Sequence, residues 1–269
     1  MTTRDPPTPT ARGGIAAVDR AWLVLQALER AGDGARLTDL ARETGLALAS
    51  LSRLLTSLEH AGLARRGPDK RFALGPALLR LGMAYRRSLR LEPLVTPLLA
   101  ELGAATDDAA TFSVRDGDHR LCLFRVESTL PLRESVSAGD RLPLGVGAPS
   151  RVLRAFSEAD PRDDEVRERG WAASLGERVQ ELAAVAAPVF GLMAAAHDGV
   201  CTTPTGTQAT PHGVQAMPLG IAMVGVLSLS GLRSRFDGAG LEARRDLVVA
   251  AAHRLSASLG APRGTESPA

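Results

Sequence analysis

The stretch from residue 19 to residue 74 constrains the fold most, because three helical patterns in it are followed by a hairpin pattern. Apolar residues spaced at i, i+3, i+4 and i+7 predict a first helix over about 19–30. A short second helix is expected to begin near Thr38, which can cap it, and to end at Gly45. A third helix is expected over about 49–60, and a hairpin follows Gly62. This order of elements is typical of a winged helix-turn-helix domain.

The third predicted helix has one apolar face and one small, polar face. The apolar stripe consists of Leu51, Leu54, Leu55 and Leu58, and the opposite face carries Ala49, Ser52, Arg53 and Thr56, with Ser50 at its edge. A solvated helix normally carries charged side chains there. Small residues instead let a helix lie close to the floor of the DNA major groove, and an arginine can reach a guanine edge or a phosphate. We therefore predict that Ala49, Ser50, Ser52, Arg53 and Thr56 contact double-stranded DNA.

The predicted hairpin is strongly basic. Four of its residues between 65 and 71 are cationic, namely Arg65, Arg66, Lys70 and Arg71. Residues 1–90 carry 15 Lys and Arg against 8 Asp and Glu, a net charge of +7, whereas residues 91–269 carry 17 against 22, a net charge of −5. A basic first part favours an anionic partner for that part alone. We predict that the hairpin is a wing whose cations contact phosphates; a solvated hairpin that happens to be basic is the alternative.

From Leu94 onward, hairpin patterns alternate with helical ones, which predicts an α+β sandwich with an antiparallel sheet. We expect helices near 94–102, 149–156 and 241–259, and a charged, helical segment at 158–170. Strands are expected at 110–114, 121–126, 132–137, 183–190 and 221–230. Residues 191–220 join two of these strands with ~30 residues where a hairpin needs ~2–5. We interpret the stretch as a flexible insertion.

These patterns divide the chain into successive regions. A disordered tail at 1–13 precedes a winged helix-turn-helix domain at 14–75, with the helix-turn-helix at about 37–57 and the wing at 63–74. A linker helix at 76–91 leads to a second domain at 92–260, and a short tail at 261–269 ends the chain. This length is comfortable for two domains, each able to bury a core without disulfides or metals.

Several classes of protein are disfavoured by what the sequence lacks. No apolar leader and no run of 18 apolar residues is present, so we predict a cytoplasmic protein without a membrane partner. Cys122 and Cys201 lie far apart without metal-ligand spacing, so we predict no metal and no cofactor. Cys122 is expected to be a buried small residue. The nucleophile and zinc motifs of common enzymes are absent, so we predict that the chain is not an enzyme.

The chain resembles the IclR family of bacterial regulators along nearly its whole length. The stretch VDRAWLVLQALERAGDGARLTDLARETGLALASLSRLLTSLEHAGLARRGPDKRFALGPALLRLG is similar to that family's DNA-binding domain. The segments FRVESTLPLRESVSAGDRLPLGVGAPSRVLRAF, GERVQELAAVAAPVF and VLSLSGLRSRF look like its effector domain. The resemblance implies a GAF-like sensor domain, a homodimer or homotetramer, and a palindromic operator. Ser50, Ser52 and Arg53 match the family's recognition-helix positions.

In the second domain, six residues match or approach the positions that line the effector pocket of family members. They are Gly147, Ala148, Ser174, Ala184, Ser228 and Ser230. Ser228 and Ser230 are two apart on a predicted strand, so their side chains point to the same face. Gly147 and Ala148 lead into a predicted helix whose free N–H groups favour an anion. We therefore expect an effector that carries a carboxylate and an apolar body, at a site that requires no charged side chain.

Two other functions remain open beside that of a ligand-responsive regulator, whether repressor or activator. One is a DNA-binding architectural protein whose second domain only oligomerises, with Ser228 and Ser230 serving merely to satisfy the sheet. The other is an enzyme built on the GAF-like domain. Such chemistry needs a reactive cysteine, and Cys122 on a predicted strand is a poor candidate.

Overall fold

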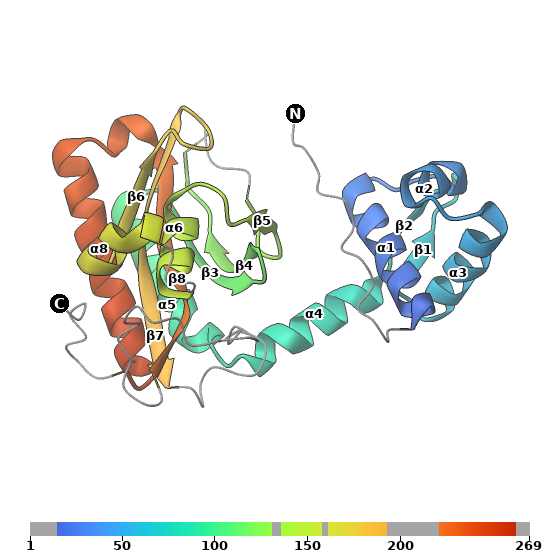
Figure 1. Cartoon of the computed structure of the whole chain (residues 1–269), viewed down its shortest axis with the longest axis horizontal. Coiled ribbons are helices and arrows are strands. Elements are labelled where there is room, and N and C mark those ends of the chain that lie inside the picture. The colour runs from blue at the N-terminus through green and yellow to red at the C-terminus, as the bar shows by residue number, and fades with distance from the viewer. Residues whose placement is uncertain (1–14, 131–135, 158–160, 193–220, 262–269) are drawn as a thin grey trace. The chain divides into compact units, whose positions relative to one another are not determined.

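The structure is a computed structural model that describes residues 15–130, 136–157, 161–192 and 221–261. The chain divides into two units, with the boundary between Ser88 and Leu89 (Figure 1). The helix expected as a linker at 76–91 is α4 (Pro76–Ser88), and it is counted with the first unit. Among the described residues, no helix is both long and apolar enough to cross a membrane.

The first unit contains the helices and the hairpin that the sequence predicts. Its elements are α1 (Ala16–Ala31), α2 (Leu37–Thr44), α3 (Leu48–His60), β1 (Ala64–Arg66), β2 (Phe72–Leu74) and α4. Strands β1 and β2 pair antiparallel. The first three helices and the hairpin share an aliphatic core in which Leu28, Leu40, Leu51, Leu55 and Phe72 are buried. This core fixes the orientation of α3, so that one of its faces is buried and the other remains exposed.

Two local details of this unit concern helix ends. The N-cap of α2 is Arg36, which makes no side-chain capping bond, so the prediction that Thr38 caps this helix is wrong. Thr38 lies in the first turn instead. Gly45 ends α2 in the left-handed conformation, with φ of 69°, as expected for a glycine that closes a helix.

The second unit is built on one antiparallel sheet of six strands. Their order is β5-β4-β3-β8-β7-β6. The bounds are β3 (Ala109–Asp116), β4 (His119–Val126), β5 (Arg141–Pro143), β6 (Ala172–Leu175), β7 (Leu182–Leu192) and β8 (Ile221–Leu232). The helices are α5 (Glu92–Thr106), α6 (Ala148–Ser157), α7 (Asp164–Arg169) and α8 (Gly238–Ser258). The predicted mixture of a helical DNA-binding domain and an antiparallel α+β domain is confirmed.

Helices cover the two faces of this sheet unequally (Figure 1). Leu227 and Leu229 of β8 pack with side chains of α5 and α8 in the main aliphatic core. On the other face, Val226 packs with the buried side of α6. Because side chains alternate along a strand, Ser228 and Ser230 face the same side as Val226. The α6 side of the sheet therefore carries the hydroxyl groups.

Several predicted elements of the second unit differ from the structure. Most of the strand predicted at 132–137 lies outside the described residues, and residues 136 and 137, which are described, belong to no strand. Strand β5 (Arg141–Pro143) was not predicted. Strand β6 was not predicted. The segment at 158–170 forms a 3-10 turn, η1 (Pro161–Asp163), and the short helix α7. Residues 191 and 192 of the predicted insertion belong to β7, and the rest of it lies outside the described residues, as does the tail at 1–13.

A buried ion cluster stabilises the junction of β3 with the C-terminal part of the chain. The carboxylate of Asp108 is fully buried and accepts hydrogen bonds from Arg235 Nη1 at 2.9 Å and Arg244 Nε at 2.5 Å. Gly231 makes room for it, since a Cβ at Gly231 would lie 2.3 Å from Asp108 Oδ1. Two guanidinium groups thus compensate one buried carboxylate.

Candidate nucleic-acid interface and ligand cavity

The exposed face of α3 is the one that the sequence predicts. Ala49, Ser52, Arg53 and Thr56 are exposed, and Ser50 is half-buried. Thr56 donates a hydrogen bond from Oγ1 to the carbonyl oxygen of Ser52 at 3.0 Å. Leu48, the first residue of α3, is 50% exposed, so apolar surface lies beside these polar groups. The face combines small side chains, one guanidinium group and one exposed leucine.

The four cations of the wing have different surroundings. Arg71 donates from Nη1 to the carbonyl oxygen of Gly34 at 3.0 Å, and its Nε lies 3.4 Å from the Asp69 carboxylate. The guanidinium group of Arg66 stacks over the ring of Phe72, 5.3 Å from its centre. The side chains of Arg65 and Lys70 are exposed and form no hydrogen bond or ion pair with any described residue. Arg65 and Lys70 are therefore the cations most available to an anionic partner.

The second unit contains a cavity over the α6 side of the sheet. The space between its lining residues amounts to about 540 Å³ when its solvent-filled opening is included, and about 40 Å³ of it can hold the centre of a water molecule. Small side chains from neighbouring strands form its floor in two rows. Ser174, Ala184 and Ser230 are cross-strand neighbours in one row, and Ser228 and Thr111 are cross-strand neighbours in the other. Small residues on β3, β6, β7 and β8 leave the space that larger side chains would fill.

Five of the six residues predicted to bind an effector line this single cavity. They are Gly147, Ser174, Ala184, Ser228 and Ser230. The sixth, Ala148, follows Gly147 at the start of α6. Ser228 is 3% exposed and Ser230 is 8% exposed, and neither hydroxyl has a hydrogen-bond partner in the described parts of the chain. Nearly buried hydroxyls without a protein partner are typical of a site that a ligand or water completes.

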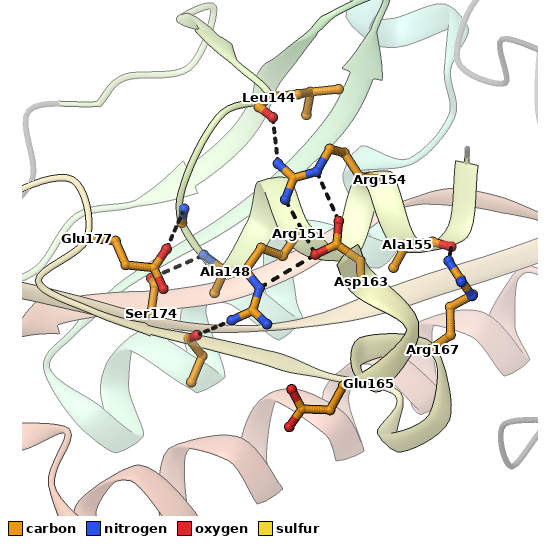
Figure 2. A network of polar contacts seen from close by, with 12 residues as sticks. Leu144, Ala148, Arg151, Arg154, Ala155, Asp163, Glu165, Arg167, Ser174 and Glu177 are labelled. Atoms are coloured by element: carbon orange, nitrogen blue, oxygen red, sulfur yellow. Dashed lines mark hydrogen bonds and ion pairs between the residues drawn. The ribbon is translucent and has the colours of Figure 1, made fainter. Parts of the chain in front are cut away.

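The N-terminus of α6 differs from the sequence-based expectation. The N–H of Gly147 donates to Glu177 Oε2 at 3.0 Å, and the N–H of Ala148 donates to Ser174 Oγ at 3.1 Å (Figure 2). These N–H groups were expected to be free to bind an anion, and that expectation is wrong. The carboxylate of Glu177 already takes the position that the positive end of the helix favours.

Charged side chains also line the cavity, although the anion site expected from the sequence required none. They are Arg120 of β4 and Glu177 and Arg178 between β6 and β7. Arg120 is only 6% exposed. Its position could have been inferred, because Arg120 lies two residues before Cys122, which was predicted to be buried on a strand. Residues two apart share a face of the sheet. Glu177 gave no such signal, since 30 residues separate it from Gly147.

An ion-pair network holds the loop that leads into α6. Arg154 donates from Nη1 to the carbonyl oxygens of Leu144 and Gly145, both at 2.6 Å, and from Nε to the Asp163 carboxylate at 2.9 Å (Figure 2). Asp163 is buried, and Arg151 lies on its other side with Nε at 3.6 Å. The network links residues 144 and 145, which immediately precede the lining residues Val146 and Gly147, to α6 and η1.

Comparisons with known proteins identify the first unit. The family model for the IclR helix-turn-helix domain matches residues 17–68, which span α1 to the wing. The transcriptional regulator BhcR of Paracoccus denitrificans is 28% identical over 278 residues, covering 93% of this chain and 89% of that protein. The chain belongs to the IclR family of transcriptional regulators. The prediction that it is a regulator and not an enzyme is thereby confirmed.

Other IclR-family proteins match parts or all of the chain. The transcriptional repressor IclR of Escherichia coli is 28% identical over 155 residues, 56% of this chain and 57% of that protein. The crystal structure of an IclR regulator from Alicyclobacillus acidocaldarius has a TM-score of 0.67 at 23% identity, covering 91% of this chain and 98% of that one. An IclR homologue from Microbacterium hydrocarbonoxydans, solved with 4-hydroxybenzoate, has a TM-score of 0.65 at 17% identity, covering 90% and 100%. These structures have the same fold as this chain.

Proposed function

We propose that this IclR-family chain binds a palindromic operator as a homodimer or homotetramer in the cytoplasm, and that a small organic acid bound in the second unit changes its affinity for that operator. The effector would act by population shift, because it favours one arrangement of the DNA-binding domains over another. The observation that carries the proposal is the cavity in which the hydroxyls of Ser228 and Ser230 have no hydrogen-bond partner among the residues that the structure describes.

DNA contact by the first unit is supported by the exposed chemistry of two elements. In winged helix-turn-helix domains the second helix of the motif enters the major groove. Here that helix is α3, which exposes Ser52 and Arg53. The wing supplies the exposed cations Arg65 and Lys70, which suit the phosphate backbone. We propose that Arg53 reads a base and that the wing holds the phosphates.

Oligomerisation is supported by apolar side chains that the single chain leaves exposed. Helix α4 has 13 residues and none of them is buried. Helices shorter than ~12–15 residues are marginal in water without packing partners. Leu79 and Leu81 of α4 are 72% and 54% exposed, and Trp22 of α1 is 61% exposed. A second copy that covers these residues would bury apolar surface on both helices and explain why α4 is stable.

An organic acid is supported by the lining of the cavity. Two arginines lie in the lining beside one glutamate, and guanidinium groups are suited to binding carboxylates. Val146, Val179 and Leu182 give it apolar surface for the body of a ligand. The structural neighbour from Microbacterium hydrocarbonoxydans was solved with 4-hydroxybenzoate, a molecule with both features. We propose a carboxylate with an apolar body as the class of effector.

Calorimetric titration of the full chain with a panel of carboxylic acids, followed by operator binding with and without the acid that binds, tests this function. The operator would first be selected from random DNA. The double substitution Ser228→Ala and Ser230→Ala is expected to abolish the response to the acid. It should leave operator affinity unchanged, because the proposed DNA contacts lie in the other unit. A double variant that still responds normally would place the effector elsewhere.

The alternative is a DNA-binding oligomer without a ligand. It predicts that no acid in the panel releases measurable heat or changes operator affinity. It also predicts that filling the cavity, for example with Ala184→Leu, leaves DNA binding and its regulation unaltered. Under the proposed function this variant binds DNA normally but no longer responds to the acid, because the leucine side chain takes the space above the floor of the cavity.

A further inference from the structure

The chain that leads into α3 exposes three consecutive apolar side chains. Ala47 is the N-cap of α3, Leu48 and Ala49 are its first two residues, and all three are exposed. Leu48 is 50% exposed, whereas Leu51 and Leu55, which follow it on the same apolar stripe, are almost completely buried. Leu48 thus extends the stripe beyond the core of the first unit and lies at the surface of the domain.

These side chains belong to the part of the helix that is expected to approach the bases. In a helix-turn-helix domain, the N-terminal residues of the second helix contact base edges in the major groove. Leu48 lies one turn before Ser52, so the two side chains are neighbours on the surface of α3. Ala49 shares the exposed face with Ser52 and Arg53. The first side chains of α3 to reach the bases are therefore expected to be apolar.

The start of α3 has almost no side chain that could form a hydrogen bond with a base. The three apolar residues have no polar side-chain group, and Ser50, which follows them, is half-buried. Thr44 is the nearest polar residue before the helix, and its Oγ1 donates to the carbonyl oxygen of Leu40 at 2.6 Å. The first turn of α3 also contains no acidic residue. Any base preference of this turn must therefore come from apolar contact.

Thymine is the base that presents an apolar group in the major groove, namely its C5-methyl group. An aliphatic side chain packed against this methyl group removes apolar surface from water, which is favourable. The same side chain packed against cytosine would cover the N4 amino group, and a buried donor without a partner costs free energy. An aliphatic first turn therefore favours T·A over C·G pairs at the positions that it reaches.

From these observations we propose that Leu48, together with Ala49, recognises the C5-methyl group of a thymine in each half-site of the operator. The inference rests on the proposed function, because it requires α3 to lie in the major groove. Leu48 precedes Arg53 by ~7.5 Å along the helix axis, which corresponds to about two base-pair steps of ~3.4 Å. The thymine is accordingly expected within about three base pairs of the base that Arg53 reads.

The test replaces thymine by deoxyuridine, which keeps the hydrogen-bonding groups of thymine but lacks the methyl group. An operator is first selected from random duplexes with the full chain, and each thymine of one half-site is then replaced in turn. By fluorescence anisotropy, replacement of one particular thymine is expected to weaken binding about fourfold, the effect of one buried methyl group, and replacement in both half-sites about 15-fold. Scrambled duplexes with the same replacements correct for effects of uracil on the DNA itself.

Three variants show whether Leu48 is responsible for the preference. Leu48→Ala should bind the thymine and deoxyuridine operators within about twofold of each other, as expected when one partner of an interacting pair is removed. Leu48→Met keeps an apolar side chain of similar volume and should retain most of the preference. Leu247→Ala is the matched control, because Leu247 is 38% exposed on α8 in the second unit, and it should keep the whole preference. Thermal unfolding of each variant verifies its fold.

The outcomes separate this inference from the proposed function. If selection enriches no sequence, the proposed operator binding and the role of Leu48 both fail. If an operator is selected and the wild type binds it equally well with deoxyuridine at every thymine, operator binding stands and methyl recognition is wrong. If the wild type prefers thymine and Leu48→Ala keeps the whole preference, another residue contacts the methyl group and the role of Leu48 is wrong. Loss of the preference in Leu48→Ala but not in Leu247→Ala supports the inference.

Discussion

The double substitution Arg65→Gln and Lys70→Gln tests how the wing binds DNA. Both side chains are exposed and have no hydrogen bond or ion pair with any described residue, so their replacement leaves the hairpin intact. The slope of log affinity against log salt is negative, and each phosphate contact that is lost reduces its magnitude by ~0.9. A dimer loses two contacts per chain, hence four, and a slope change of ~3.6.

This change in slope corresponds to a large difference in salt sensitivity. Between about 50 and 200 mM salt the wild type is expected to lose roughly 100-fold more affinity than the double variant. The assay is fluorescence anisotropy of labelled operator DNA and of scrambled DNA, each titrated at five or more salt concentrations. Because phosphates carry no sequence information, the slope should change equally for both DNAs.

Arg71→Gln provides the matched control, because Arg71 is bound within the domain. Its hydrogen bond to the carbonyl oxygen of Gly34 holds the wing against the segment that precedes α2. We expect this variant to unfold at lower temperature, with a loss of about 1 kcal/mol, and to change the salt slope less than either Arg65 or Lys70 does. If the slope of log affinity against log salt is the same in the wild type and in the Arg65 and Lys70 double variant, the wing is a solvated hairpin that does not contact phosphates.

Three further results are expected. Arg53→Ala should cost ~1–3 kcal/mol of operator affinity and relax specificity at one base position, and an equal loss on scrambled DNA would make Arg53 a phosphate contact. Asp108→Ala leaves two partly buried guanidinium groups without their carboxylate and should lower the free energy of unfolding in urea by about 3–5 kcal/mol; a loss under 1 kcal/mol would contradict this. Burial raises the pKa of the Cys122 thiol to about 11, so in a Cys201→Ser background a thiol reagent at pH 8 should label Cys122 only after unfolding, and rapid labelling of the native protein would refute its burial.

Local patterns in the sequence predict the long elements well. The stripes of Leu51, Leu55 and Leu58 on α3, and the alternation of Leu227 and Leu229 on β8, are visible in the sequence because each element is long enough to repeat its period. Each stripe also predicts the opposite face, which is how the exposed face of α3 and the side of Ser228 were found.

The short edge strands and the polar partners of the cavity could not be predicted in this way. Strands β5 and β6 have three and four residues and are defined by their pairing with β4 and β7. Two or three residues of alternation carry too little signal. The hydrogen bond from the Gly147 N–H to Glu177 joins residues 30 apart, and it decides that the α6 N-terminus is occupied. Contacts of this kind exist only after the chain has folded.

The alternation along β8 has a consequence for how such a regulator can evolve. Leu227 and Leu229 pack in the aliphatic core, while Ser228 and Ser230 face the cavity. Under the proposed function, a single nucleotide change at either serine codon would alter which metabolite the protein recognises, while the neighbouring leucines continue to hold the sheet to α5 and α8. Ligand specificity can therefore change by mutation without loss of the stability of the fold. Duplicated copies of one gene could then respond to different compounds while they keep the same core.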